Sequence, residues 1–265
     1  METRATRIAL SAWVVLVVAF LLFPIVLIGV YAFNKSNVQS WPITSFTTHW
    51  FGDAWNNQDV RDALWLSVKV GLVATGIAVV LGTAVAFALQ RFRFFGREIV
   101  SLILVLPIAL PGIITGMALN SFFITGGIDL SLWTIVIGHA TFCIVIVYNN
   151  VVARLRRSSP SLVEASMDLG ADGWQTFRYV TWPVLSTALV SGALLAFALS
   201  FDEVIVTYFT AGAQNTLPLW IFGAIRQGTQ LPQVNAVVLV WILVTLIPVF
   251  VSVRLTRDTG ILRRR

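Results

Sequence analysis

The sequence contains few charged residues for its length. Asp, Glu, Lys and Arg together make up 11% of the 265 residues, against roughly 25% in an ordinary soluble domain. Hydrophobic residues make up 57% and the mean hydropathy is +0.85, so the chain has too few polar groups to cover a water-facing surface. The formal net charge of +6 does not indicate nucleic-acid binding, because the basic residues stand at the ends of apolar runs and not on one folded face. The composition therefore indicates a membrane protein.

Residues that support metal, redox or nucleotide chemistry are also scarce. The single cysteine, Cys143, lies in an apolar run, where we expect it to pack in the core. The two histidines, His49 and His139, are far apart and lack a metalloprotease or zinc spacing. We expect His139 to form hydrogen bonds inside a helix bundle. No G-x-x-x-x-G-K-[ST] loop occurs to hold the phosphates of ATP, so we predict no metal, no cofactor and no enzyme activity in this chain.

Long apolar runs dominate what remains. A bilayer core of about 30 Å requires about 20 apolar residues in a helix. Six runs meet that length, and they cover residues 8–33, 64–89, 99–124, 130–153, 184–211 and 234–253. None shows the alternating pattern of a barrel strand. The first run shows no convincing cleavage site, so we interpret it as a retained span. These runs predict an all-α membrane protein with six transmembrane helices in a single domain over residues 1–265.

The distribution of basic residues predicts the orientation. With the N-terminus in the cytoplasm, 14 of the 18 Lys and Arg residues fall on the cytoplasmic side. The four exceptions are Lys35, Arg61, Lys69 and Arg226. We therefore expect both termini in the cytoplasm.

Two apolar runs contain residues that are unusual inside a membrane helix. In "LPIALPG" of the third run, Pro107 and Pro111 each remove a helix hydrogen bond, which predicts a kink or break. In "LSFDEVIVTYF" of the fifth run, Asp202 and Glu203 form the only acidic pair inside an apolar run. Counted along a helix from Val184, the pair falls about 27 Å from its start. Carboxylates at that depth need a watery cavity or a cationic partner.

The predicted cytoplasmic loop, residues 154–183, contains "SLVEASMDLGADGWQTF". The first helix begins either at Ser161, with Glu164 completing a capping box, or at Ser159 before Pro160. Gly170 is placed where that helix would end. Asp172 and Gln175 repeat the capping pattern and start a second short helix. The first helix has a mildly apolar face without an evident partner in the chain, which favours docking onto another molecule. That face is formed by Leu162, Val163, Ser166 and Leu169.

This loop resembles the cytoplasmic signature of binding-protein-dependent ABC importer permeases. The family signature is Glu-Ala-Ala, a glycine four residues later, and an apolar-x-Leu-Pro close. The matching residues here are Glu164, Ala165, Ser166, Gly170, Val180, Thr181, Trp182 and Pro183. Ser166 replaces the second alanine and Trp182 the leucine, and the spacing is intact. "LPIALPGIITGMAL", "GHATFCIVIVYNNVVARLRR" and "FALSFDEVIVTYFTAG" extend the resemblance over nearly the whole chain, where it looks most like the spermidine/putrescine class.

The resemblance implies a type I ABC importer permease fold, with a coupling helix between the fourth and fifth spans in the cell (inner) membrane of a prokaryote. It also implies several partners: a second permease subunit, more often a different chain, an ATPase dimer that binds ATP and Mg²⁺, and an extracytoplasmic substrate-binding protein. The residues that would couple to the ATPase are Ser161, Glu164, Ala165, Ser166, Asp168, Gly170 and Pro183.

For a polyamine substrate, Asp202 and Glu203 are candidate cation contacts, and Tyr208 and Trp220 are candidate aromatic faces. The local alternatives are that the acidic pair meets water at the outer mouth or bonds a neighbouring helix, and that Glu164, Asp168 and Gly170 only shape their own helix.

Other functions also remain open. The chain could be an importer permease for another small solute, an ion-coupled secondary transporter, a membrane scaffold or a channel. A secondary transporter would show internal repeats or buried charges in several spans, and a channel would show a pore-loop signature. Neither pattern is clear in the sequence.

Overall fold

The computed structural model describes residues 4–159, 161–228 and 230–258. It is built of helices, and an isolated bridge between Asn34 and Phe46 is the only β pairing within these residues. The helical elements are α1 (Arg4–Ala32), α2 (His49–Asn56), α3 (Gln58–Arg91), α4 (Arg97–Ala109), α5 (Gly112–Thr125), α6 (Leu132–Arg157), α7 (Ser161–Asp168), α8 (Gly173–Thr176), a π-helical turn η1 (Phe177–Thr181), α9 (Trp182–Asp202), α10 (Ile205–Thr210), α11 (Leu217–Gln227) and α12 (Leu231–Asp258). The fold class predicted from the sequence is confirmed.

Four helices are long and apolar enough to cross a bilayer, and they match the first, second, fourth and fifth predicted spans. These four are α1, α3, α6 and the continuous segment from Gly173 to Asp202. The sixth predicted span, residues 234–253, falls within α12, in which side chains beyond Val244 lie outside the described residues. The number of six spans therefore stays a prediction.

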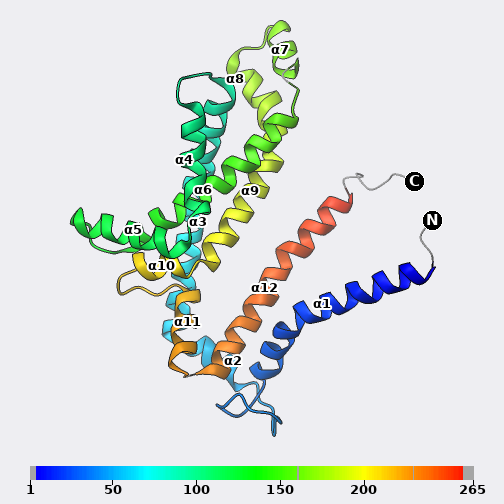
Figure 1. Ribbon diagram of the computed structural model, residues 1–265, viewed down its shortest axis with the longest axis vertical. Coiled ribbons are helices and arrows are strands. Elements are labelled where there is room, and N and C mark those ends of the chain that lie inside the picture. The colour runs from blue at the N-terminus through cyan, green and yellow to red at the C-terminus, as the bar shows by residue number, and fades with distance from the viewer. Residues whose placement is uncertain (1–3, 160, 229, 259–265) are drawn as a thin grey trace. The chain divides into compact units, whose positions relative to one another are not determined.

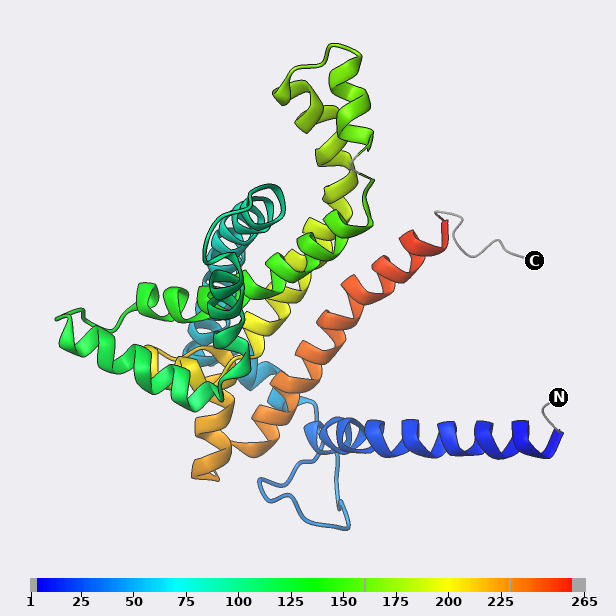
Figure 2. The same cartoon turned by 45° about the horizontal axis from the view of Figure 1, so that its top comes forward.

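The third predicted span consists of two helices, α4 and α5, that meet at an angle of 106° (Figures 1 and 2). The break lies at Leu110 and Pro111. Leu110 has an extended backbone (φ −82°, ψ 144°), as expected for a residue that precedes proline. Pro107 remains inside α4. A break was predicted for this run, but only Pro111 produces it.

The fifth predicted span begins and ends elsewhere than expected. The helix starts at Gly173, eleven residues before the predicted start at residue 184, and continues through η1 into α9. Pro183 has no N–H to bond the carbonyl one turn back, and the wider π turn immediately before it accommodates the proline. At the other end the helix stops at Asp202, and α10 follows after Glu203 and Val204. The expected uninterrupted run to residue 211 is therefore wrong.

Contacts group the chain into two compact units, Met1–Val60 with Ile221–Arg265, and Arg61–Trp220. In the first unit, α12 packs against α1 and α2. Leu239 of α12 lies against Gly29 of α1. The prediction of one permease domain over the whole chain remains a prediction.

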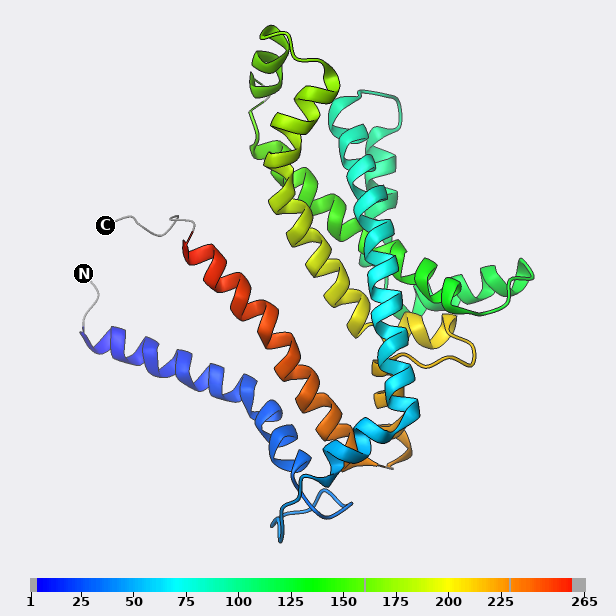
Figure 3. The ribbon, with the colours of Figure 1, turned by 180° about the vertical axis from the view of Figure 1, so that it is seen from behind.

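In the second unit, α6 is the central helix and runs side by side with α9 (Figures 1 and 3). Fully buried Ala78 and Ala86 of α3 join this core, together with Cys143, Val147 and Val151 of α6. Cys143 is thus a core residue, as predicted. The α7 and α8 helices lie at one end of the α6 and α9 pair, and α10 lies at the other (Figure 1). Both candidate functional regions belong to this unit.

Candidate functional sites at the two ends of the helix pair

The α7 helix begins with the alternative cap. The Ser159 hydroxyl accepts the Ser161 N–H (3.3 Å) and lies 2.6 Å from the Ser161 hydroxyl, and the Ser159 carbonyl accepts the Leu162 N–H (3.2 Å). Within the described residues no hydrogen bond or ion pair involves the Glu164 side chain. The capping box at Ser161 and Glu164 is therefore wrong, because Ser159 already satisfies the first amide. Glu164 stays exposed on α7 together with Ala165 and Asp168.

Gly170 ends α7 in a Schellman motif. The Ala171 N–H donates to the Ser166 carbonyl (3.1 Å) and the Gly170 N–H donates to the Met167 carbonyl (2.9 Å). Gly170 has φ +84°, a left-handed conformation that a side chain disfavours. The glycine predicted to end this helix therefore has a definite backbone role.

The second helix begins as predicted and then continues. Asp172 accepts the Gln175 N–H (2.8 Å), and the Gln175 side chain accepts the Asp172 N–H (3.0 Å), which is a complete capping box. Because α8 continues into η1 and α9, this box starts the fifth span and not a separate short helix. Pro183, the last residue of the signature, is the second residue of α9.

The α7 helix is tied to α8 by one side-chain hydrogen bond. The Ser166 hydroxyl lies 3.0 Å from the hydroxyl of buried Thr176. An alanine at residue 166, as in the family signature, could not make this bond. Ser166 belongs to the face of α7 that was predicted to have no partner in the chain. Thr176 is a partner for this part of the face.

Two large apolar side chains near α7 stay mostly exposed, although Trp174 stacks on Phe177. Leu169 is 90% exposed and Trp174 is 69% exposed. Short helices that expose large apolar side chains in water are marginal by themselves. The sequence-based expectation of a docking surface is consistent with this end of the helix pair.

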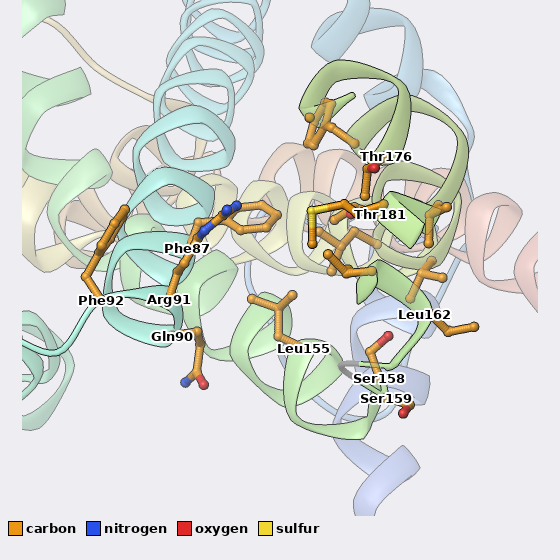
Figure 4. A pocket seen from close by; sticks show the side chains of 17 residues that line it. Phe87, Gln90, Arg91, Phe92, Leu155, Ser158, Ser159, Leu162, Thr176 and Thr181 are labelled. Atoms are coloured by element: carbon orange, nitrogen blue, oxygen red, sulfur yellow. The ribbon is translucent and has the colours of Figure 1, made fainter. Parts of the chain in front are cut away.

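A cavity of about 820 Å³ separates α7 from the last turns of α3 and α6 (Figure 4). Phe87, Gln90 and Arg91 line one side of it, and Leu162 and Thr176 line the other. Within the described residues α7 thus packs against α8 and η1, and the cavity lies between α7 and the ends of α3 and α6.

The acidic pair lies at the break between α9 and α10, and its two members differ. Asp202 is the last residue of α9 and is exposed. Glu203 is partly buried, and its carboxylate accepts the Val206 N–H (2.9 Å), which caps α10. One Glu203 oxygen also lies about 4.0 Å from the place that a Cβ on Gly112 would occupy, so the breaks of the third and fifth runs adjoin.

The two aromatic candidates are less closely connected to this break. Tyr208 on α10 is half exposed and packs edge-on against Phe209. Trp220 lies in α11 and is partly buried. In the described residues no hydrogen bond, ion pair or ring contact joins either of them to Asp202 or Glu203.

The α10 helix is held firmly by α5 and α6. Asn120 of α5 donates to the Phe209 carbonyl (2.6 Å), and the Thr134 hydroxyl of α6 lies 2.7 Å from the Thr210 carbonyl and equally far from the Ser131 carbonyl. Gly138 of α6 allows close approach, because a Cβ there would lie 3.1 Å from Val206. These polar ties were not predicted from the sequence. A signal was present, since Asn and Thr recur inside apolar runs, where polar groups join membrane helices.

His139 forms hydrogen bonds within the bundle, as predicted. Its side chain is 1% exposed and contacts the hydroxyls of Ser200 and Thr207, each at 2.8 Å. Across residues 4–159, 161–228 and 230–258, no three His, Cys, Asp or Glu side chains gather as metal ligands.

Comparison with known proteins identifies the family. Residues 78–257 match the family model described as binding-protein-dependent transport system inner membrane component. The chain is 33% identical over 252 residues to the spermidine/putrescine transport system permease protein PotC of Haemophilus influenzae, covering 94% of this chain and 97% of that protein. It is 34% identical over 226 residues to the putrescine transport system permease protein PotI of Escherichia coli K12, covering 82% and 79%. A more distant relative, at 27% identity over 221 residues and covering 82% and 81%, is the putative 2-aminoethylphosphonate transport system permease protein PhnV of Salmonella paratyphi A.

A solved structure supports the fold. A chain of a bacterial ABC transporter involved in the import of the acidic polysaccharide alginate matches with a TM-score of 0.65 at 18% identity, covering 97% of this chain and 98% of that one. The signature, which runs from α7 through the Gly170 turn to η1 and the start of α9, the family match over most of the chain and this structural likeness agree. The chain belongs to the family of inner membrane components of binding-protein-dependent transport systems.

Proposed function

We propose that this chain is the transmembrane permease subunit of an ATP-driven importer for polyamines. The observation that carries this proposal is the 33% identity to a spermidine/putrescine permease over almost the full length of both chains. In this proposal the chain forms part of the pathway across the membrane, and hydrolysis takes place in another subunit.

The proposed ATPase contact is the α7 and α8 end of the second unit. Exposed Leu169 and Trp174 offer an apolar surface, and exposed Glu164 and Asp168 offer polar contacts beside it. An ATP-binding cassette dimer that holds ATP and Mg²⁺ would cover this surface on the cytoplasmic side, with both termini of the chain on that side. A second, different permease chain and an extracytoplasmic binding protein would complete the complex.

Movement of α7 would pass to the fifth span through α8. The Ser166 and Thr176 hydroxyls join the two helices, and α8 is continuous through η1 with α9. A continuous helix can transmit a displacement along its length, whereas a cavity lies between α7 and the end of α3. We propose that ATP binding in the partner moves α7 and that α9 reorients the pathway in response.

The proposed cation contact is Asp202. Its exposed carboxylate stands at the C-terminal end of α9, where the last backbone carbonyls also favour a positive charge. An ammonium group of a polyamine matches both features. Glu203 has a different role in this proposal, because its carboxylate already caps α10.

The test is the ATPase activity of the purified complex in lipid nanodiscs with its binding protein. The complex is titrated with spermidine, putrescine, 2-aminoethylphosphonate and a neutral sugar. Stimulation by the polyamines alone is the expected result. Stimulation by 2-aminoethylphosphonate alone would assign the chain to the other solute, and a purified complex without an ATPase subunit would overturn the importer itself.

The contribution of Asp202 is tested in the same complex with Asp202→Asn. We expect KM for spermidine-stimulated ATPase activity to rise roughly tenfold, since loss of one partly solvated charge contact is worth about 1–2 kcal/mol. An unchanged KM for spermidine-stimulated ATPase activity in Asp202→Asn would show that Asp202 is not part of the cation site. The permease assignment would still stand.

A further inference from the structure

A buried histidine connects the two helices that flank the break in the fifth run. His139 is on α6, and its ring lies between Ser200 on α9 and Thr207 on α10. All three side chains are buried, with exposed fractions of 1%, 3% and 0%. Polar side chains removed from water in this way carry a free-energy penalty unless their hydrogen bonds are complete.

The hydrogen-bond partners favour one position of the ring proton. The Thr207 hydroxyl lies 2.7 Å from the Glu203 carbonyl, which can only accept, so the hydroxyl has an acceptor four residues back in the chain. With the hydroxyl hydrogen directed there, the Thr207 oxygen accepts from His139 and the ring hydrogen is on Nε2. In a neutral ring Nδ1 is an acceptor, and the Ser200 hydroxyl donates to it.

This chain of hydrogen bonds crosses the break. It runs from Ser200 through the His139 ring and Thr207 to the Glu203 carbonyl, at the residue between the two helices. Three other polar residues of the bundle each contact one side of the break. Cys143 donates to the Ala196 carbonyl of α9 (3.3 Å), whereas Asn120 donates to a carbonyl of α10 and the Thr134 hydroxyl lies 2.7 Å from another.

We propose that His139 is a positioning residue that fixes the angle of this break and so holds the Asp202 carboxylate in place for a cationic substrate. Asp202 is the last helical residue before the break, and its side chain has no hydrogen bond or ion pair within the described part of the chain. Its place therefore depends on how α9 ends relative to α10. This inference rests on the proposed cation site at Asp202.

The functional experiment compares His139→Leu with Cys143→Ala in the complete complex with its binding protein. His139→Leu removes the tie across the break, while Thr134 and Asn120 still hold α10. We expect KM for spermidine-stimulated ATPase activity to rise roughly tenfold, or about 1.4 kcal/mol, with little change in the maximal rate, because the Asp202 carboxylate is no longer held in place. The control Cys143→Ala removes a hydrogen bond from α6 to α9 on one side of the break, and it should leave KM unchanged.

His139→Gln tests whether both ring nitrogens are needed. A glutamine amide can retain one of the two contacts but cannot bridge both hydroxyls, so it should raise KM nearly as far as leucine does. Full rescue by glutamine, or a loss of maximal rate with unchanged KM, would overturn the positioning role.

A second measurement examines the hydrogen-bond chain without substrate. The complex is labelled with ¹⁵N-histidine, and the signal that disappears in His139→Gln is assigned to His139 by solid-state NMR. We expect a neutral ring with the proton on Nε2, shifted by Thr207→Val and unchanged by Thr207→Ser. A proton on Nδ1, a doubly protonated ring or insensitivity to Thr207→Val would overturn the inference.

These measurements separate the two proposals. If Asp202→Asn leaves KM unchanged while the NMR signal behaves as expected, the cation site fails and the hydrogen-bond chain stands without its proposed use. If Asp202→Asn raises KM and His139→Leu does not, the cation site stands and the positioning role of His139 fails.

Discussion

The two ends of the α6 and α9 pair satisfy their polar and apolar groups in different ways. At the α10 end, a six-residue helix is tied by side-chain hydrogen bonds from Asn120, Thr134 and His139. At the α7 end, a helix of eight residues has one side-chain hydrogen bond to α8 and a large cavity beside it. At the first end the polar ties are completed within the chain, although Ile205 and Tyr208 of α10 stay exposed. The second end has fewer such ties and leaves Leu169 almost fully exposed.

The difference follows from where each short helix lies in the predicted topology. A break inside a membrane run exposes backbone groups that lipid cannot satisfy, so neighbouring helices must supply the partners. A loop in the cytoplasm has water for its polar groups and can leave apolar side chains to be covered on assembly. Changes at the α7 end should therefore impair assembly and coupling, and changes at the α10 end should impair the chain itself or its substrate site.

The largest expected effect is at the α7 end. Leu169→Ala should weaken binding of the ATPase subunit roughly 10- to 100-fold, since burial of a leucine is worth about 1.5–3 kcal/mol. The measurement is the dissociation constant of the ATPase from the permease pair in nanodiscs. Leu169→Met, which keeps the apolar volume, is the control. Unchanged affinity in Leu169→Ala would show that this exposed end is not the docking surface.

The next effect is at the turn that ends α7. Gly170→Ala places a side chain at φ +84°, which costs about 1–2 kcal/mol and should lower the uptake per ATP hydrolysed. Gly173→Ala is the matched control, because that glycine has open space around it and no positive φ. Equal coupling in both variants would contradict a role for the Gly170 turn.

A smaller effect is expected at the tie between α7 and α8. Ser166→Ala removes the bond to Thr176 and should lower the coupling ratio roughly fivefold, as expected for about 1 kcal/mol. Ser166→Thr keeps a hydroxyl and serves as the comparison. A rise in basal ATPase activity without loss of uptake would point to regulation and not to transmission through this bond.

The smallest effect is expected at the completed end. Glu203→Gln retains an acceptor for the Val206 N–H, so KM and thermal stability should change little. Glu203→Ala removes the cap and should destabilise the complex by about 1 kcal/mol, measured as a shift of the unfolding midpoint. A large rise of KM in Glu203→Gln with unchanged stability would assign cation binding to Glu203 also.

Local sequence patterns predicted the parts of the coupling region that depend on neighbours in the chain. The capping box at Asp172 and the left-handed glycine at residue 170 involve groups only a few residues apart. The residue types at these positions are therefore enough to predict both features. The choice between Ser159 and Ser161 as the start of α7 could not be made, because both offered the same hydroxyl chemistry.

The break at Asp202 was missed for a physical reason. Its apolar flanks fit a continuous helix, and the penalty of interrupting that helix is offset by partners 61 to 89 residues away along the chain. Glu203, followed by β-branched Val204, Ile205 and Val206, is a weak signal for a new helix start. The local sequence looks the same whether Glu203 caps a helix or binds a substrate cation, so the sequence could not distinguish these two roles.

The sequence by itself determined that this is a helical membrane protein, which runs are apolar, where a helix ends at Gly170, and the resemblance to an importer family. Hydrophobic length and backbone chemistry act locally, so they can be read along the chain. Only the tertiary structure decided that Glu203 caps a helix while Asp202 stays exposed, and that His139 joins the two sides of the break. Those roles depend on hydrogen bonds between residues far apart in the chain, and such partners exist only after the helices have packed.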